Sequence, residues 1–389
     1  MGSRASQNAI DFPSRPLRVL HISDIEAPSY YFNNLCDFTD NSEIRFYSIT
    51  FGSRAGFVEE LEKRGVPSYA LNAMNRRQYP YAARHIWTRI KEDNVDIVHL
   101  HLLVPTFIGL VVAKLCGRKV VVTRHHSDAV HKIQNSVKRK FYLSIENYIN
   151  RHADHLIAPS RMVRDILVEQ EGVPATRVSL IPYGQTVDRF DAITPEIVAR
   201  TKEQLRMNGQ MVLVCNSRLY ERKGHIYLFE ALAPLIRQGL NATLFLIGRG
   251  GHQARLEQLA EQMGLKNHVQ FLGWRNDALA IMAAADIIVH PSLEDALSQA
   301  LIESLMLGRP IIASDISGVR DILDEGKYGV IVPPADAGAL RRALENTILD
   351  IDKARERASP GRNHIVEYMN ARVVARAYTE CYKKVWSLG

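Results

Sequence analysis

Two carboxylates frame what looks like the first turns of a helix near residue 300. In the stretch "SLEDALSQALIESLML", Asp295 precedes Ser298, and Glu303 lies within a run whose apolar residues recur at helical spacing. A carboxylate accepts two hydrogen bonds from a vicinal diol, so Glu303 could hold a ribose and Asp295 a sugar hydroxyl. The backbone amides of Ala296, Leu297 and Ser298 would point at the same ligand. The alternative is that Asp295 is an acid favoured by the helix dipole and Glu303 an ordinary exposed side chain.

A second group of residues suits a diphosphate. Arg218 and Lys223 lie in "NSRLYERKGH", which follows a strand-like run, and Lys223 stands just before the next expected helix. A guanidinium binds two phosphate oxygens, and an ammonium adds a point charge beside a helix N-terminus. In "LIGRGG", Gly248 would let the backbone approach a ligand. Each segment alone fits solvated charges or a plain turn glycine equally well, and neither is a dinucleotide fingerprint or a P-loop.

Histidines gather in the first half of the chain. His99 and His101 share one face of an expected strand, and "VVTRHHSDAV" adds His125 and His126 at the end of the next strand. Four histidines could suggest zinc, but no acidic ligand pattern accompanies them, so we expect no metal and no other cofactor. His125 and His126 alternate sides, so only one of them can easily face a ligand.

These residues can act together only if the strands that precede them end close together. The hydrophobic pattern of the chain predicts such strands. Short β-branched runs alternate with amphipathic stretches of helical length, which is typical of parallel sheets covered by helices on both faces. The runs span 18–23, 44–50, 96–101, 119–125 and 155–160, then 211–217, 242–248, 269–273, 286–292 and 310–315. Because the series restarts near residue 210, we predict an α/β protein with two doubly wound, Rossmann-like domains. Ligands of such sheets bind at the carboxyl ends of the strands.

The predicted domains span 1–190 and 191–372, and a last helix over 373–389 could cross back to the first domain. With 46% hydrophobic and 23% charged residues, the 389-residue chain has the composition of a soluble globular protein. No signal peptide precedes the first strand-like run, and the four cysteines have no metal-ligand spacing, so we expect a cytoplasmic protein. We expect no nucleic-acid partner.

Taken together, these motifs resemble those of the retaining GT-B glycosyltransferases of family 4, the glycosyl transferases group 1. "SLEDALSQALIESLMLGRPIIAS" is similar to the family's acidic residue, seven others and Glu, with Asp295 and Glu303 in the acidic places. Arg218 and Lys223 match the residues that hold the donor diphosphate. "FLGW", which ends at Trp274, matches the segment that borders the nucleobase, and "YGVIVPPADAGAL" and "IPYGQTVDRF" match two further segments.

The resemblance implies two domains that face each other across a cleft, the second binding the donor and the first the acceptor. It implies a metal-independent, retaining transferase of hexosyltransferase type that uses a UDP-sugar or GDP-sugar. Its acceptor would be a sugar, a lipid-linked molecule or another small molecule in polysaccharide, glycolipid or glycoconjugate synthesis. "TRHHSD" is similar to the family's "T-x-H-G-x-D", which implies that His125 positions the donor sugar and, with Asp295, serves catalysis.

Some residues depart from the family pattern. The loop after the first strand reads "SDIEAPSYYF", with Ala-Pro-Ser at 27–29 where a Gly-Gly pair usually approaches acceptor and donor. Asp295 is one methylene shorter than the usual Glu, His126 stands where Gly is usual, and Tyr183 replaces Asn. Two other functions share the nucleotide-sugar contacts: a GT-B-fold nucleotide-sugar epimerase, and a catalytically silent sugar-nucleotide binding protein.

A basic segment at 131–151 suggests a membrane surface. The net charge of the chain is +7, and residues 101–150 alone hold 8 Lys+Arg against 2 Asp+Glu. On a helix, Phe141, Ile145, Tyr148 and Ile149 share one face, and the cluster 138–140 lies toward its start. The segment is therefore either a core-facing helix with a basic end or a peripheral contact with anionic lipid that brings a membrane-associated acceptor.

Overall fold

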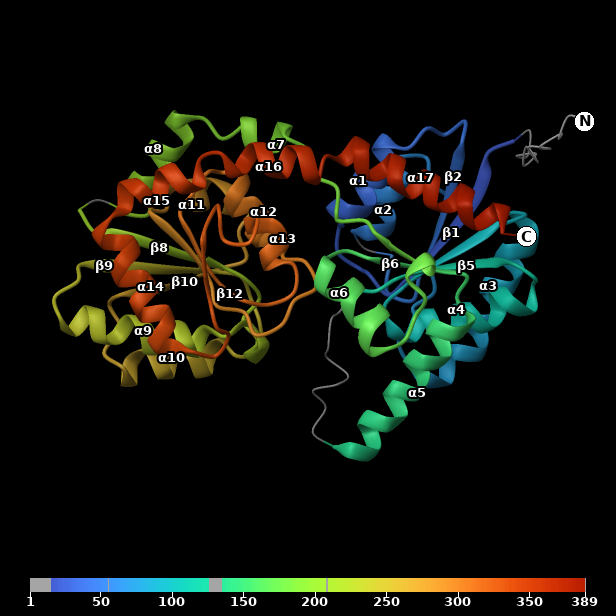
Figure 1. Cartoon of the computed structure of the whole chain (residues 1–389), viewed down its shortest axis with the longest axis horizontal. Coiled ribbons are helices and arrows are strands. Elements are labelled where there is room, and N and C mark those ends of the chain that lie inside the picture. The colour runs from blue at the N-terminus through green and yellow to red at the C-terminus, as the bar shows by residue number, and fades with distance from the viewer. Residues whose placement is uncertain (1–14, 55, 126–134, 208, 389) are drawn as a thin grey trace, which may run out of the picture. The chain divides into compact units, whose positions relative to one another are not determined.

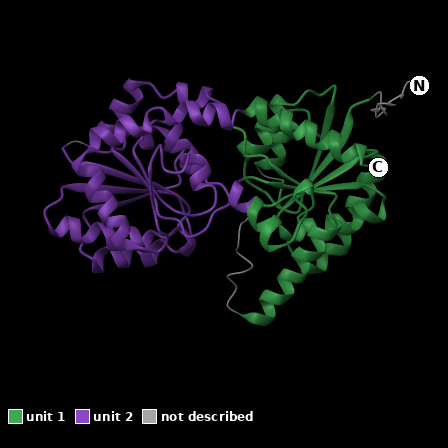
Figure 2. Cartoon of the chain, in the orientation of Figure 1, with its two compact units in different colours: residues 1–159, 164–184, 371–389 green, residues 160–163, 185–370 purple. Residues whose placement is uncertain are grey.

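The chain forms two compact units (Figures 1 and 2). The computed structural model describes residues 15–54, 56–125, 135–207 and 209–388. Unit 1 comprises residues 1–159, 164–184 and 371–389, and unit 2 comprises residues 160–163 and 185–370. The chain thus enters unit 2 after Gly184, earlier than the boundary expected at residue 190, and returns to unit 1 at Ala371. His126 and the start of the basic segment, 131–134, lie outside the described residues.

Unit 1 is built on a seven-stranded parallel sheet in the order β3-β2-β1-β4-β5-β6-β7. The strands are β1 (Leu17–Ser23), β2 (Ile44–Thr50), β3 (Ser68–Ala70), β4 (Ile97–His101), β5 (Lys119–Thr123), β6 (His155–Ala158) and β7 (Val178–Leu180). The central strand β4 is buried along its whole length, because helices cover both faces of the sheet. The strand order reverses between β1 and β4, where ligands of such sheets usually bind.

Helices on both faces complete unit 1. They are α1 (Tyr30–Phe38), α2 (Phe57–Glu62), α3 (Tyr79–Glu92), α4 (Leu103–Leu115), α5 (Ser136–His152) and α17 (Ala371–Ser387). The C-terminal helix α17 belongs to unit 1, as the sequence suggested (Figure 2). It buries Tyr378 and Tyr382 in the core that contains Val19 and Phe46. None of the helices in the described ranges combines the length and the apolar character that a membrane-spanning segment needs.

Unit 2 is built on a six-stranded parallel sheet in the order β10-β9-β8-β11-β12-β13. The strands are β8 (Met211–Asn216), β9 (Ala242–Ile247), β10 (Val269–Gly273), β11 (Ile287–His290), β12 (Ile311–Ser314) and β13 (Val330–Val332). The helices are α7 (Asp188–Asp191), α8 (Pro195–Gln204), α9 (His225–Arg237), α10 (Gln253–Gln262), α11 (Ala278–Ala284), α12 (Gln299–Met306), α13 (Val319–Leu323), α14 (Ala337–Leu349), α15 (Ile351–Ala358) and α16 (Gly361–Tyr368). The short helix α6 (Arg161–Asp165) holds residues of both units.

Every strand-like run forms a strand, which confirms the predicted α/β fold with two parallel sheets. The sequence did not predict β3, β7 and β13. Each of these strands has three residues and lies at the edge of its sheet. Three residues are too few to show a period, and an edge strand needs less apolar surface than a central one.

The loop that lacks the Gly-Gly pair is packed against its neighbour. The Glu26 carboxylate accepts a hydrogen bond from the Ser53 amide at 2.8 Å. A Cβ atom at Gly52 would lie 2.4 Å from Glu26 Cγ, and one at Gly56, whose φ is +67°, would lie 2.9 Å from Pro28 Cδ. Glycines of the following loop therefore make room for the larger residues of this one.

Candidate functional site

A hollow of ≈ 680 Å³ opens in unit 2 at the carboxyl ends of β8, β9, β10 and β11. This volume suits a small-molecule ligand. The hollow is lined by Asn216, Ser217, Arg218, Lys223, Gly248, Arg249, Trp274, His290, Asp295, Leu297, Ser298, Gln299, Ala300 and Glu303. It contains every donor-binding residue expected from the sequence except Ala296, which lies beside it in the chain and whose carbonyl accepts a hydrogen bond from Ser317.

Lys223 and Asp295 form an ion pair in this hollow. The distance from Lys223 Nζ to Asp295 Oδ2 is 2.6 Å, and the Lys223 side chain is buried. Burial alone would raise the pKa of Asp295, but the Lys223 ammonium and the His290 imidazole hold this pKa below its usual value. The backbone segments that carry the two residues approach each other closely. A Cβ atom at Gly224, next to Lys223, would lie 2.0 Å from the Pro291 carbonyl oxygen, so only glycine fits there. The sequence predicted both residues in the site but did not predict that they would pair.

Glu303 lies on the second turn of α12 and is also paired. Ser298 caps this helix and accepts a hydrogen bond from the Leu301 amide, as expected for a helix that starts there. Arg189 Nη1 lies 3.0 Å from Glu303 Oε1, and the Gln299 amide donates to the same oxygen at 3.4 Å. Burial raises the pKa of Glu303 above its usual value, although Arg189 opposes the shift. Glu303 is therefore buried and paired, and the alternative that it is an ordinary exposed side chain is wrong.

Arg218, Trp274 and Gly248 complete the wall of the hollow. Arg218 is exposed, and its guanidinium carbon lies 5.5 Å from the centre of the Tyr220 ring. Trp274 is 62% exposed, so its ring is available to a planar ligand. A Cβ atom at Gly248, whose φ is +135°, would lie 2.1 Å from the Ser217 carbonyl oxygen. Packing alone therefore requires this glycine, whether or not a ligand approaches it.

Two buried histidines belong to the same region. His290 ends β11, and its Nε2 atom has no hydrogen-bond partner among the residues that the structure describes. His225 begins α9 and bonds through Nε2 to the Ser217 hydroxyl at 3.0 Å. Burial lowers the pKa of each imidazole to about 4, so both are neutral at physiological pH. His290 therefore offers the hollow a neutral donor or acceptor beside the ion pair.

Several of these residues were not predicted from the sequence. Arg189 was within the quoted segment "IPYGQTVDRF", but its distance in sequence from Glu303 hid their contact. His290 ended a predicted strand and could have been suspected, because strand ends carry the site residues of such sheets. Nothing in the sequence marked Gln299, which also bonds to Gln185.

His125 lies in unit 1, just after β5, and uses both ring nitrogens within that unit. Its Nε2 atom lies 2.9 Å from His101 Nδ1, and its Nδ1 atom lies 2.8 Å from the Tyr183 hydroxyl. Tyr183 is the residue that replaces the family's Asn. The departure at this position therefore gives the family histidine a phenol as hydrogen-bond partner.

Two protein families match this chain. The family described as Glycosyltransferase Family 4 matches residues 30–189, and the family described as Glycosyl transferases group 1 matches residues 199–364. These segments correspond to most of unit 1 and most of unit 2. The matches favour neither a nucleotide-sugar epimerase nor a silent binding protein.

Individual relatives are sugar transferases by name. The phosphatidyl-myo-inositol mannosyltransferase of Mycobacterium leprae is 27% identical over 84% of this chain and 83% of its own length. The UDP-Gal:alpha-D-GlcNAc-diphosphoundecaprenol alpha-1,3-galactosyltransferase of Escherichia coli is 25% identical over 68% of this chain and 70% of its own length. The structure of Anabaena Alr3699/HepE in complex with UDP-glucose is 21% identical, covers 95% of this chain and all of its own, and superposes with a TM-score of 0.80. This last similarity supports the fold alone.

Proposed function

Because the chain belongs to the family 4 glycosyltransferases of the GT-B fold, which use nucleotide-sugar donors, we propose that it is a metal-independent hexosyltransferase that retains the anomeric configuration. The donor is a UDP-sugar or a GDP-sugar. One observation carries the proposal: the hollow of unit 2 gathers three cationic residues, two carboxylates and the start of α12 at the carboxyl ends of parallel strands.

In this proposal, Arg218 and Lys223 bind the donor diphosphate. Negative charge develops on the diphosphate as the bond to the sugar breaks, and fixed cations stabilise that charge most when water is excluded. Lys223 is buried and already oriented by Asp295, so it would bind with little reorganisation. The amides of Leu297 and Ser298 at the start of α12 add to the same field.

The two carboxylates take different parts of the donor. Glu303 accepts hydrogen bonds from the ribose, and Asp295 holds the transferred sugar while it orients Lys223. Burial raises the pKa of Glu303, and Arg189 opposes this shift and so favours the carboxylate, which is the form that accepts hydrogen bonds from the ribose hydroxyls. His125 positions the donor sugar, and hydrogen bonds from both of its ring nitrogens hold its ring in place.

The acceptor is a sugar or a lipid-linked molecule, and α5 attaches the protein to an anionic membrane that carries it. Phe141 and Tyr148 of α5 are exposed, as is Phe107 of α4, whose ring lies 5.8 Å from that of Tyr148. Lys138 and Lys140 are exposed at the start of α5. An apolar surface beside basic residues suits reversible binding to anionic lipid. The E. coli relative is named for a diphosphoundecaprenol-linked acceptor, which supports a lipid-linked substrate class.

Ligand-dependent stabilisation tests the donor site. Melting temperatures are measured with UDP, GDP and their common sugar conjugates, because a ligand at 100 times its Kd stabilises the folded state by about 2.7 kcal/mol. One nucleotide series should stabilise the wild type and should stabilise the Lys223→Ala variant much less at the same concentration. The matched control is Lys266→Ala, which removes an exposed lysine of unit 2 that pairs with Glu261.

Product analysis tests the reaction itself. With the stabilising donor and a panel of sugar and lipid-linked acceptors, the anomeric coupling constant of the product should equal that of the donor. Activity should survive EDTA. An inverted product, or strict dependence on a divalent ion, would contradict the proposed chemistry. Conversion of the donor into its epimer without an acceptor would instead support the epimerase.

A further inference from the structure

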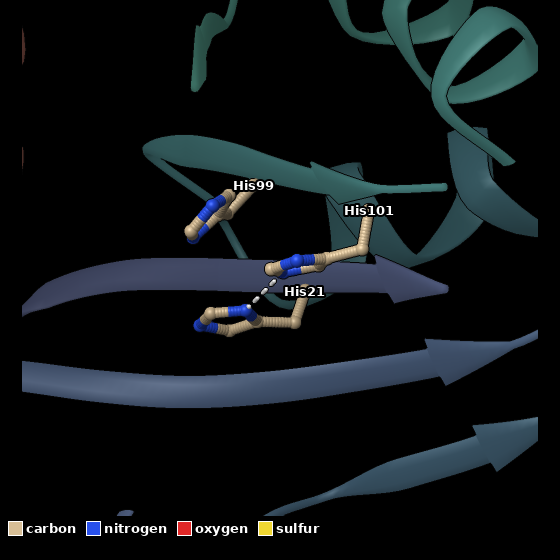
Figure 3. Close-up of side chains that lie close together, drawn as sticks. All are labelled: His21, His99 and His101. Carbon is tan, nitrogen blue, oxygen red and sulfur yellow. Dashed lines mark hydrogen bonds between the residues drawn. The ribbon is translucent and has the colours of Figure 1, made fainter. Parts of the chain in front are cut away.

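Three fully buried histidines of unit 1 lie side by side without a part in the donor site. Figure 3 shows His21 on β1 and His99 and His101 on β4. One ring nitrogen from each of the three lies within 4.8 Å of the other two. Their exposed fractions are 3%, 0% and 0%. Among the described residues, no carboxylate or thiol belongs to this group. A buried divalent ion would therefore have no charged ligand, which makes a metal site costly here.

The sheet register brings the rings together. His21 of β1 pairs with His99 of β4, and His101 of β4 pairs with Thr123 of β5. His99 and His101 are two residues apart on one strand, so both side chains point to the same face. His125 continues that face two residues beyond Thr123. The polar groups thus form one row across the carboxyl ends of three neighbouring strands.

Hydrogen bonds join this row to His125. His21 Nδ1 lies 2.9 Å from His101 Nε2, as the dashed line in Figure 3 marks. His101 Nδ1 lies 2.9 Å from His125 Nε2, and His125 Nδ1 lies 2.8 Å from the Tyr183 hydroxyl. Each imidazole in the row therefore bonds to the next through nitrogens on opposite sides of its ring.

The row also continues in the other direction, to the C-terminal helix. The Tyr382 hydroxyl of α17 lies 3.5 Å from His21 Nε2 and 2.7 Å from His99 Nδ1. His99 Nε2 lies 2.8 Å from the Thr123 hydroxyl. The ring nitrogens of His21, His99 and His101 all have partners, so the network is satisfied without an ion.

Neutral imidazoles make this network directional. Burial lowers the pKa of His21 to about 3, and burial together with the neighbouring histidines lowers the pKa of His99 and His101 well below the usual value. A neutral ring has one N–H donor and one acceptor nitrogen. If His21 donates from Nδ1, then His101 and His125 must also carry their proton on Nδ1. If His125 donates from Nε2, all three must carry it on Nε2.

We propose that His21, His101 and Tyr382 are positioning residues that set the tautomer and the ring orientation of His125. The hydroxyl of Tyr382 acts on His125 through two intervening imidazoles, so a residue of the C-terminal helix contributes to the histidine that the family pattern places in the site. The tautomer coupling stands on the geometry of unit 1 alone. Its effect on catalysis rests on the proposed function.

Long-range proton–nitrogen NMR of the 15N-labelled protein measures the tautomers directly. We expect His21, His101 and His125 to show the same tautomer at neutral pH. Tyr382→Phe removes the distant hydroxyl without touching His125, and it should change the nitrogen shifts of His125. The control is His155→Asn, which replaces another fully buried histidine of the same sheet, bonded to Ser179 and outside the row. It should leave His125 unchanged.

Two substitutions of His101 separate coupling from simple packing. An asparagine amide lies near the position of Nδ1 and can still bond to His125, whereas a glutamine amide lies near Nε2 and can bond only to His21. Because an amide both donates and accepts, His101→Asn keeps a partner for His125 but cannot transmit a tautomer. Both variants should therefore mix the tautomers of His125, and both should lower kcat by up to about tenfold with little change in donor KM.

Some results would overturn the proposal. They are different tautomers among the three rings of the wild type, an unaltered His125 in the Tyr382→Phe variant, or full restoration of wild-type shifts and kcat in His101→Asn. Stoichiometric zinc in the purified protein, removed by the His101 variants, would also overturn it in favour of a metal site. Coupled tautomers with no detectable transferase activity in the wild type would leave the positioning network standing and count against the proposed function.

Discussion

The hollow of unit 2 and the histidine row of unit 1 place polar groups at the ends of their strands in opposite ways. Unit 2 uses ions near an opening, where Lys223 is paired with Asp295 and Arg189 with Glu303. Unit 1 uses neutral rings and hydroxyls in a sealed row, where His21, His99 and His101 have exposed fractions of 3% or less. Ions beside an opening can exchange a protein partner for a ligand. Neutral groups in the core can fix the orientation of their neighbours, but they cannot neutralise the charge of a ligand.

This difference follows from the cost of burial. An unpaired buried charge costs several kcal/mol, so unit 2 must pair each ion until a ligand replaces its partner. A neutral imidazole costs far less to bury if both nitrogens are bonded. The burial of unit 1 therefore selects uncharged histidines, and the opening of unit 2 allows charged residues. Four predictions test whether the contrast holds.

Acidification should unfold unit 1 before unit 2. The folded pKa values of His21, His99 and His101 lie below the unfolded value of about 6.5, so their contribution to stability is present above that pH and is lost as the pH falls. Each such histidine costs about 2 kcal/mol of stability between pH 7 and pH 5. Unit 2 has two, His225 and His290.

The raised pKa of Glu303 works in the opposite direction, because a raised pKa stabilises the protonated form in the folded state. Hydrogen exchange measured peptide by peptide from pH 7 to pH 5 reports the two units separately. We expect protection in β1 and β4 to fall before protection in β8 and β11. Loss of protection in unit 2 first would show that the neutral row is not the more acid-sensitive site.

Lys223→Ala should weaken nucleoside diphosphate binding by one to two decades. Loss of a charge-assisted contact costs about 1.5–3 kcal/mol. The effect should lie at the upper end of this range, because the Asp295 carboxylate then faces the diphosphate without Lys223 between them. Calorimetric titration of the nucleoside diphosphate measures it, with Lys266→Ala as the control. Unchanged affinity would show that the diphosphate binds elsewhere.

The two carboxylates of unit 2 should separate into binding and turnover. Glu303→Gln should weaken binding of the free nucleotide by about 1 kcal/mol, the usual net value of a hydrogen bond. Asp295→Asn should spare the nucleotide and lower kcat. In the wild type, nucleotide affinity should decline on acidification at a pH above 4.5, because burial raises the pKa of Glu303. The Gln variant should lose this decline. Equal effects of both substitutions on nucleotide affinity would show that the assignment is wrong.

The sequence predicted the site of unit 2 better than the network of unit 1. Lys223, Asp295 and Glu303 belong to short motifs whose residue types match a charged ligand, so their presence in one hollow could be expected from strand-end rules together with the family resemblance. The row of unit 1 depends on register. His21 and Tyr382 carry no motif, and only the pairing of β1 with β4 and the return of α17 bring them to His101. Ion pairs between distant residues, such as Arg189 with Glu303, were hidden for the same reason.

The smallest effect concerns the outer surface of unit 1, where charge is exposed rather than excluded. The structure buries Ile149 of α5 in the core, which confirms the core-facing interpretation for that part of the helix. Val137, Phe141 and Tyr148 are exposed, and the membrane contact stays a prediction.

Each basic residue near an anionic membrane contributes about 1 kcal/mol, so replacing the three at 138–140 with Gln should weaken attachment without unfolding the protein. Co-sedimentation with phosphatidylglycerol vesicles at low salt should show binding by the wild type and much weaker binding by the triple variant. The control replaces Arg237, Arg255 and Lys266, three exposed basic residues of unit 2, and changes the net charge equally. At 1 M salt the Debye length shortens to about 3 Å, so binding of the wild type should fall toward that of the variant.

Equal losses in both triple variants would mean that net charge alone attracts the vesicles. Absence of wild-type binding at low salt would show that the proposed membrane contact is wrong and would favour a soluble acceptor. A loss confined to the α5 variant would show that the exposed basic residues at the start of α5, unlike the neutral histidine row of unit 1, take part in binding.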